Sequence, residues 1–199
     1  MRTQMIFGVV VLGLALGAPV NAAQVTPDPA TQREFAARVN VCGVCHGNNG
    51  VPKSGNIPII WGQQENYLVK QMHDFRSGER SFEIMEWMTK TLQENEQAPT
   101  AANLAGRRWP AKAQNAPAAP AAPRGIAVCQ SCHSANYQGA VQAEGMTTPR
   151  LAGQNYEYLV EAMRRFADGE RTNNADMVQI MKGISATDRD AMAKYLSSL

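Results

Sequence analysis

Residues 42–46 read Cys-Gly-Val-Cys-His, and residues 129–133 read Cys-Gln-Ser-Cys-His. Each segment is a C-x-x-C-H motif, in which two thiols and an imidazole stand at positions i, i+3 and i+4. On an α-helix these positions fall on one face. Both thiols can therefore reach the vinyl groups of one porphyrin while the imidazole reaches its iron. The pattern predicts covalent attachment of haem.

The two motifs contain all four cysteines of the chain. We therefore expect two covalently bound haem c groups. Their cofactor-binding residues would be Cys42, Cys45, Cys129 and Cys132, and their iron ligands would include His46 and His133. A thioredoxin-like redox pair would not need a histidine after both motifs. A zinc site would need more ligands nearby.

Segments after the two motifs repeat each other at a constant offset of 91 positions. The shared residues are Gly62, Tyr67, Leu68, Met72, Phe75, Gly78, Glu79 and Arg80 in the first copy and Gly153, Tyr158, Leu159, Met163, Phe166, Gly169, Glu170 and Arg171 in the second. Eight identical residues at one constant offset indicate a duplicated domain. Residues 110–124 are rich in proline and alanine and predict a semi-extended linker. We expect domains at residues 34–109 and 125–199.

The apolar positions of both copies recur with a helical period, as in Tyr67, Leu68, Met72 and Phe75. A glycine follows each run and is expected to end the helix. Residues 188–199 predict a terminal helix after a Ser185 or Thr187 cap, and its counterpart near residues 93–109 is less clear because of Pro99. Since no useful length of sequence alternates apolar and polar residues, the fold class is expected to be all-α.

The sixth iron ligand separates an electron carrier from a haem catalyst, because a filled position leaves no place for substrate. An alignment of the repeats across a one-residue insertion pairs Leu92 with Ile184. Met85 and Met177 then both lie seven residues upstream, so we expect them to be the axial methionines. Other candidates are Met88 and Met181, which are not equivalent to each other, Met72 and Met163, which fit a helical core, and Met146.

A proline follows each motif histidine, Pro58 after His46 and Pro149 after His133. A proline carbonyl at this place is well positioned to accept the Nδ1–H of the proximal imidazole. Such a bond fixes the tautomer and raises the donor strength of the other nitrogen. The alternative is a simple turn proline.

The first 22 residues have the features of a secretory signal peptide. Arg2 precedes an apolar run from Met5 to Gly17, and Val20-Asn21-Ala22 offers small residues for cleavage. We therefore expect a periplasmic protein, or one loosely attached to the membrane if the run stays as an anchor. The remaining basic and acidic residues nearly balance, which makes nucleic acid an improbable partner.

Beyond the motifs, the sequence resembles the cytochrome c4 family over about residues 34–199. The resemblance rests on PxxxGQxxxYL at residues 58–68, its twin at 149–159, and FxxGxR after Phe75 and Phe166. It implies two class I cytochrome c domains facing each other about a pseudo-twofold axis. It also implies His/Met ligation, with Met85 on the first haem and Met177 on the second. The family's LSDxD segment is replaced by LQENE at Leu92 and ISATD at Ile184, and the linker is long.

We therefore expect a carrier of single electrons between a quinol-oxidising complex or dehydrogenase and a terminal oxidase, and not an enzyme. One alternative is the dedicated cytochrome subunit of a periplasmic dehydrogenase. Another is a dihaem enzyme, such as a peroxidase or thiosulfate dehydrogenase, with one iron open. The equivalent methionines oppose the enzyme. His73, the single histidine outside the motifs, is expected to be an exposed helix side chain, and Trp61 to serve local packing.

Overall fold

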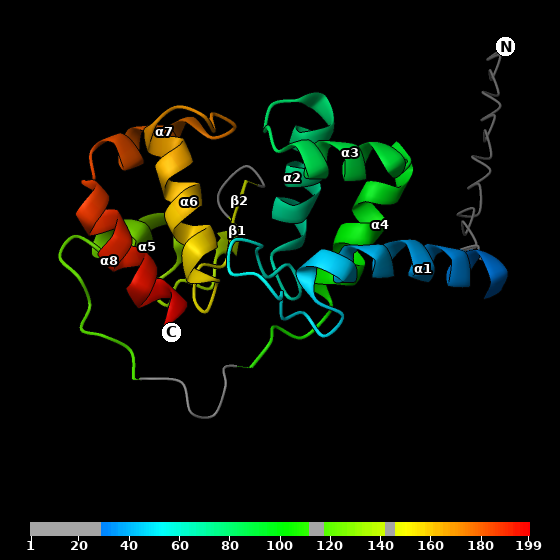
Figure 1. The fold of residues 1–199 in the computed structure, drawn as a ribbon, viewed down its shortest axis with the longest axis horizontal. Coiled ribbons are helices and arrows are strands. Elements are labelled where there is room, and N and C mark those ends of the chain that lie inside the picture. The colour runs from blue at the N-terminus through cyan, green and yellow to red at the C-terminus, as the bar shows by residue number, and fades with distance from the viewer. Residues whose placement is uncertain (1–28, 112–117, 142–145) are drawn as a thin grey trace, which may run out of the picture.

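The computed structural model describes residues 29–111, 118–141 and 146–199 (Figure 1). The signal peptide expected at residues 1–22 lies outside these ranges. The helices are α1 (Pro29–His46), α2 (Glu65–Ser77), α3 (Glu83–Thr91), α4 (Glu94–Ala105), α5 (Ala127–His133), α6 (Tyr156–Ala167), α7 (Ala175–Lys182) and α8 (Ala186–Ser197). Two short strands, β1 (Ala140–Val141) and β2 (Thr147–Thr148), pair antiparallel. The expectation of an all-α fold class is thus confirmed, apart from this small hairpin.

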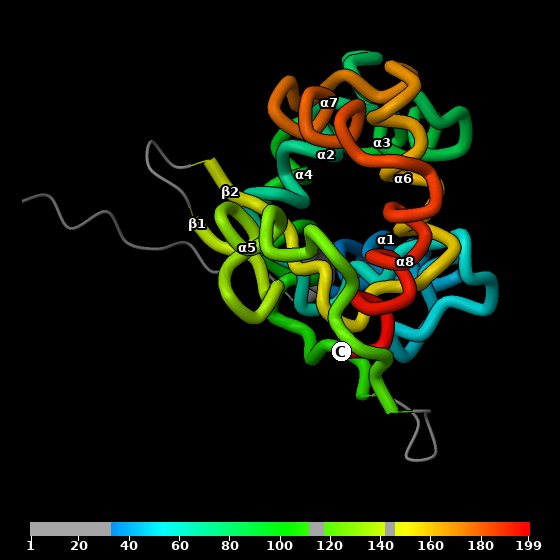
Figure 2. Tube along the Cα trace, turned by 90° about the vertical axis from the view of Figure 1, so that its left-hand side faces the viewer, coloured from blue at the N-terminus to red at the C-terminus, as the bar shows by residue number. Residues whose placement is uncertain are grey.

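The helices form two groups that lie side by side (Figure 1). In the first group α2 packs against α3 and α4, and in the second α6 packs against α7 and α8. Figure 2 shows α3 and α7 together at the end of the molecule opposite the two C-x-x-C-H helices, α1 and α5. The duplication in the sequence is therefore visible as two similar helix arrangements.

Each group has its own apolar core. One core contains Met72 on α2 and the other contains Met163 on α6, so both methionines are packing residues, as the helical period predicts. The first cluster consists of Val39, Leu68, Met72, Ala101 and Leu104. The second is larger and includes the side chains of Leu159, Met163, Phe166, Met181, Met192 and Leu196.

The helix expected near residues 93–109, which was less clear from the sequence because of Pro99, does form. It is α4. A capping box between Gln93 and Glu96 satisfies the first backbone N–H groups. Proline removes a single N–H donor from the ladder, while Ala101 and Leu104 on the following turn are buried in the first core. Capping and burial together outweigh the local cost of the proline.

The other expected helix ends are also found. Gly78 follows α2 with φ 84°, a left-handed conformation that glycine adopts without steric cost. The Ser185 side chain accepts a hydrogen bond from Asp188 N at 3.1 Å and so caps α8. None of the helices in the described ranges has the length and apolar character that crossing a membrane requires.

Candidate haem centres

Both motif histidines are buried and held by a proline carbonyl. His46 ends α1 and His133 ends α5, and their side chains are 7% and 5% exposed. His46 Nδ1 lies 2.8 Å from the carbonyl oxygen of Pro58, and His133 Nδ1 lies 2.8 Å from that of Pro149. The two bonds predicted from the sequence are confirmed. With Nδ1–H donating to a carbonyl, Nε2 is the nitrogen that can bind a metal.

The equal geometry is reached through loops of different length. Pro58 follows its histidine by 12 residues and Pro149 by 16. The longer loop contains the β1–β2 hairpin, whose Thr148 donates to the carbonyl of Cys132 at 2.7 Å. The two loops thus differ in length, yet both place a proline carbonyl at the same distance from the ring nitrogen.

Burial also sets the protonation of the site. It lowers the pKa of His46 and of His133 below the ordinary value for imidazole, although the bond to the proline carbonyl acts in the opposite direction. Both rings are consequently neutral at neutral pH, the form that ligates iron. Burial raises the pKa of the Cys42 thiol, and that of Cys129 to about 11.

None of the four cysteines forms a disulfide in the structure. Within each motif the first cysteine is the less exposed of the two. Two thiols one helical turn apart beside a neutral imidazole with a fixed tautomer are the donor set that haem c requires. The residues therefore fit the cofactor, and Cys42, Cys45, Cys129 and Cys132 are its candidate attachment points.

The expected axial methionines occupy matching places on helices other than those of the histidines. Met85 is the third residue of α3 and Met177 the third residue of α7, and each helix follows an extended N-cap residue. Both side chains are half-buried. Met181 is 2% exposed in the second core, and Met146 is 52% exposed. The equivalence derived from sequence thus has a structural counterpart, while the ligand role itself stays a prediction.

Two buried glutamines join the halves in a reciprocal arrangement that the sequence did not reveal. Gln154 accepts from Ile59 N at 2.8 Å and donates to Ile59 O at 2.9 Å. Gln63, its repeat partner, accepts from Arg150 N at 2.7 Å and donates to Arg150 O at 3.0 Å. Ile59 and Arg150 are themselves 91 positions apart. These contacts obey a pseudo-twofold relation between the halves.

A second reciprocal set lies between α2 and α6. Arg80 donates to Tyr158 Oη at 3.2 Å, and its repeat partner Arg171 donates to Tyr67 Oη at 3.4 Å. Gln71 breaks the symmetry. Its side-chain amide oxygen, Oε1, accepts one hydrogen bond from Arg80 and one from Arg171, each at 2.8 Å. Burial acts to raise the pKa of Tyr158, but the two guanidinium groups outweigh it and lower that pKa to about 7. All four tyrosine and arginine positions are identities between the repeats, which is the signal that could have identified them.

The glutamine contacts lead to a stability prediction. Replacement of Gln154 by leucine leaves the main-chain N–H and C=O of Ile59 without these partners, and each buried group left unpaired costs about 1–3 kcal/mol. We expect a loss of roughly 2 kcal/mol or more in the free energy of unfolding, measured by urea denaturation. The control is Gln179→Leu on the exposed side of α7. Equal stability of the two variants would contradict the structural role of Gln154.

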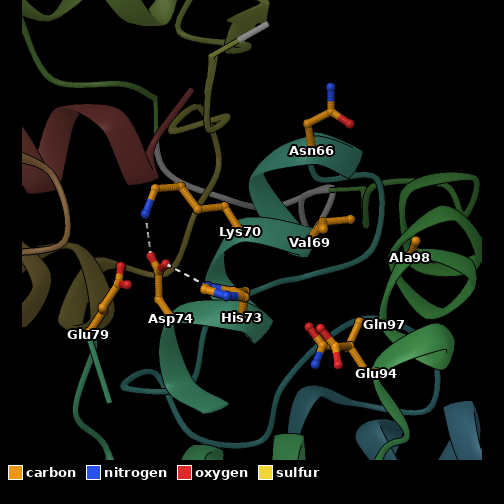
Figure 3. A pocket seen from close by; sticks show the side chains of 9 residues that line it. All are labelled: Asn66, Val69, Lys70, His73, Asp74, Glu79, Glu94, Gln97 and Ala98. Atoms are coloured by element: carbon orange, nitrogen blue, oxygen red, sulfur yellow. Dashed lines mark hydrogen bonds and ion pairs between the residues drawn. The ribbon is translucent and has the colours of Figure 1, made fainter. Parts of the chain in front are cut away.

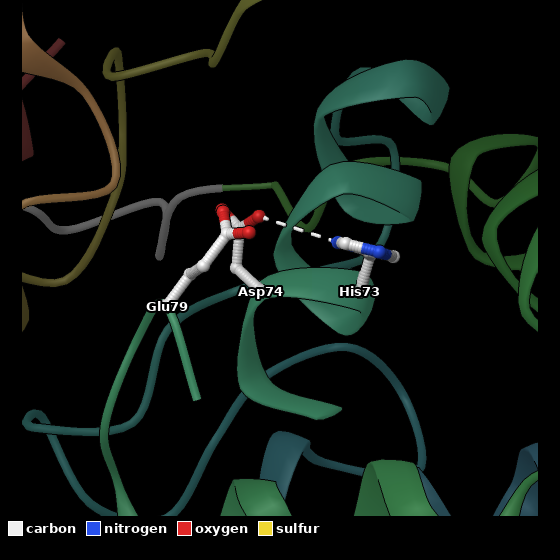
Figure 4. A group of neighbouring side chains, drawn as sticks. All are labelled: His73, Asp74 and Glu79. Atoms are coloured by element: carbon white, nitrogen blue, oxygen red, sulfur yellow. Dashed lines mark ion pairs between the residues drawn. The ribbon is translucent and has the colours of Figure 1, made fainter. Parts of the chain in front are cut away.

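A further polar cluster lies on α2, away from both motifs. His73, Asp74 and Glu79 have potential metal-ligand atoms within 4.8 Å of one another (Figure 4). Asp74 is 1% exposed, and its carboxylate already accepts from Lys70 Nζ at 2.6 Å and from Asn173 in the second half. His73 is 60% exposed, as expected from sequence. We interpret the cluster as a link between the halves rather than a metal site.

A surface hollow of about 610 Å³ adjoins this cluster between α2 and α4 (Figure 3). Lys70 extends across it toward Asp74, and Glu94 and Gln97 approach from the α4 side. Its lining residues include none of the motif residues. The hollow is therefore unconnected with the candidate haem centres.

A pair of such centres in a duplicated helical fold defines the class of c-type cytochromes with two covalently bound haems. The Cytochrome c family model matches residues 124–199. Cytochrome c4 of Pseudomonas aeruginosa is 31% identical over 176 residues, which cover 82% of this chain and 86% of the relative. The chain belongs to the cytochrome c4 family, whose cofactors are two haem c groups and whose function is electron transfer.

Other relatives agree with this assignment. The thiosulfate dehydrogenase electron acceptor of Stutzerimonas stutzeri is 30% identical over 174 residues, which cover 79% of this chain and 78% of the relative. The structure of cytochrome c4 from Acidithiobacillus ferrooxidans superimposes with a TM-score of 0.68 at 28% identity, covering 79% of this chain and 98% of that one. The resemblance stated from the sequence is thus confirmed.

Proposed function

We propose that the chain is a periplasmic carrier of single electrons between a quinol-oxidising complex or dehydrogenase and a terminal oxidase, and not an enzyme. In this proposal residues 34–109 and 125–199 each carry one haem, and residues 110–124 link them. Bound haem supplies an Fe(III)/Fe(II) couple. The observation that carries the proposal is the pair of equivalent sites, each with a buried histidine held at 2.8 Å from a proline carbonyl.

The first haem would be held by Cys42, Cys45, His46 and Met85, and the second by Cys129, Cys132, His133 and Met177. His46 and His133 keep one tautomer and one ring orientation because their Nδ1–H groups donate to carbonyls. The methionines close the remaining iron position. A filled and fixed coordination sphere suits electron transfer, because little has to move when the charge changes.

The interface between the halves supports transfer between the two centres. Gln63 and Gln154 bind the opposite main chain through two bonds each, and Arg80 and Arg171 reach the opposite tyrosines. These direct bonds fix the distance and orientation of one half relative to the other. A fixed separation favours a constant rate of electron exchange.

A second candidate is a cytochrome that serves one dehydrogenase. It is favoured by the likeness to the thiosulfate dehydrogenase electron acceptor of Stutzerimonas stutzeri. The haem chemistry would be the same, and only the permanence of the partner would differ. Purification from the native periplasm distinguishes the two, because a free carrier leaves the column without a catalytic subunit.

The carrier proposal predicts that the protein is redox active but nearly inert toward small iron ligands and peroxide. A peroxidase needs an open iron and a base beside it, whereas His73, the histidine outside the motifs, is exposed on α2. Carbon monoxide is added to the reduced protein and hydrogen peroxide to both redox states. We expect slow, substoichiometric binding and no peroxide turnover above that of free haem. Fast stoichiometric binding with turnover would favour the enzyme.

A further inference from the structure

The two halves differ at three exposed positions around the methionine helices. In the first half Phe82, Ile84 and Trp87 are 52%, 50% and 61% exposed. Across the one-residue insertion that equates Met85 with Met177, the second half has Asn174, Asp176 and Gln179 at these places. Ile84 and Trp87 stand at positions i and i+3 of α3, and Phe82 is its N-cap residue; we call these three residues the apolar patch. It is thus a property of one half and has no counterpart on α7.

The patch is not a displaced part of the core. On α3 the buried side is formed by Thr89, which is 2% exposed and donates to the carbonyl of Met85 at 2.9 Å. On α7 the residue equivalent to Thr89 is Met181, also 2% exposed. The first half therefore has a polar residue on the inner side of this helix and large apolar residues on the outer side. The described residues of this chain leave the three apolar side chains half-exposed or more, and a docking partner would cover them.

Charges around the patch indicate the kind of partner. Glu83 and Glu86 lie in the first turn of α3, and Glu79 precedes that helix in the chain, beside His73 and Asp74. In the second half the carboxylate equivalent to Glu79 is Glu170, which Arg164 binds at 2.6 Å. His73 replaces that arginine in the first half. The patch consequently lies among carboxylates that repel a second copy of this chain and attract a basic surface.

Two cationic side chains near the apolar patch have partners of their own. Arg76 donates to the main-chain carbonyls of Thr89 and Leu92 at the far end of α3, and Lys90 lies on the last turn. Arg165 donates to Ser81 O at 2.8 Å but has Glu170 at 3.5 Å. Arg76 and Arg165 are thus engaged by other groups of this chain.

We propose that the apolar patch is the docking surface for a redox partner protein whose contact face is apolar and ringed by lysine or arginine, and that this partner exchanges electrons through the first haem only. The proposal rests on the proposed carrier function. Met85 is the neighbour of Ile84 on α3, so a partner seated on the patch contacts the helix that carries the candidate ligand. Exposed aromatic anchors such as Trp87 commonly dominate small, transient interfaces.

Binding is tested with mitochondrial cytochrome c as a basic redox-protein probe, with both proteins oxidised and at low salt. Zero-length carbodiimide coupling joins carboxylates to lysines, and mass spectrometry locates the products. We expect cross-links concentrated at Glu79, Glu83 and Glu86. The variant Phe82→Asn/Ile84→Asn/Trp87→Gln keeps every charge and should weaken calorimetric binding about tenfold or more. Trp87→Gln alone gives the same direction if the triple variant folds poorly.

The matched control is Gln179→Ala on the exposed side of α7, at the position equivalent to Trp87, which should leave the affinity unchanged. Absent binding, equal cross-linking of both halves, or unchanged affinity in the triple variant would overturn the proposal. So would a concentration-dependent dimer, detected by ultracentrifugation, that the triple variant abolishes. Because no electron is transferred in this assay, its outcome is independent of the carbon monoxide and peroxide tests of the carrier function.

Discussion

Replacement of Met85 or of Met177 by alanine is expected to remove methionine ligation from one haem and leave the other intact. The two residues hold the same place, third in α3 and third in α7, and both side chains are half-buried. A thioether stabilises ferrous iron. Each variant should therefore lower the reduction potential of one centre and open that iron to carbon monoxide.

The measurement is the weak near-infrared band of ferric haem with a methionine ligand, combined with a redox titration. Half of the band should disappear in each single variant, and all of it in the double variant. Met146→Ala is the matched control, since Met146 is 52% exposed and belongs to a segment peculiar to the second half. An intact band in Met85→Ala or Met177→Ala would show that the assignment of that ligand is wrong, and Met88 or Met181 would be tested next.

The histidine sites could be predicted because their chemistry is local. A C-x-x-C-H motif fixes its own geometry on one helix, and the carbonyl needed by the imidazole comes from a proline within the following loop. Pro58 and Pro149 stand at different distances along the chain, yet both carbonyls lie 2.8 Å from the ring nitrogen. The repeated sequence around them, and not the loop length, was the reliable signal.

The contacts between the halves could not be predicted in the same way. Gln63 and Gln154 were visible as repeated residues, but their partners are main-chain atoms of residues 87 and 95 positions away. Such bonds depend on how two separately folded units are oriented, which no local pattern encodes. Gln71 is harder still, because its partner position in the second repeat is Ala162, and it accepts from both Arg80 and Arg171.

Local propensity also gave an incomplete account of the helices. Pro99 made α4 doubtful, and the structure forms it because a capping box and buried residues on the next turn compensate for one missing donor. The β1–β2 hairpin was not expected, since each strand has only two residues and no alternating pattern can show in so short a segment. Tertiary context decides both cases.

Wild-type protein is expected to carry two haems in thioether linkage, with no thiol and no disulfide remaining. The thiols of Cys42 and Cys129 stand one helical turn before those of Cys45 and Cys132, and the neutral imidazoles of His46 and His133 follow directly. Thioethers survive acid and organic solvent, whereas haem held by axial ligands alone is released. Denaturation therefore distinguishes covalent attachment from simple binding.

The most direct test is the intact mass of the protein, purified from its own host and measured under denaturing conditions after treatment with a thiol-alkylating reagent. The account predicts the mass of the polypeptide plus two haems, with no alkyl group added. A mass excess of one haem or none, or alkylation at any of the four cysteines, would contradict it.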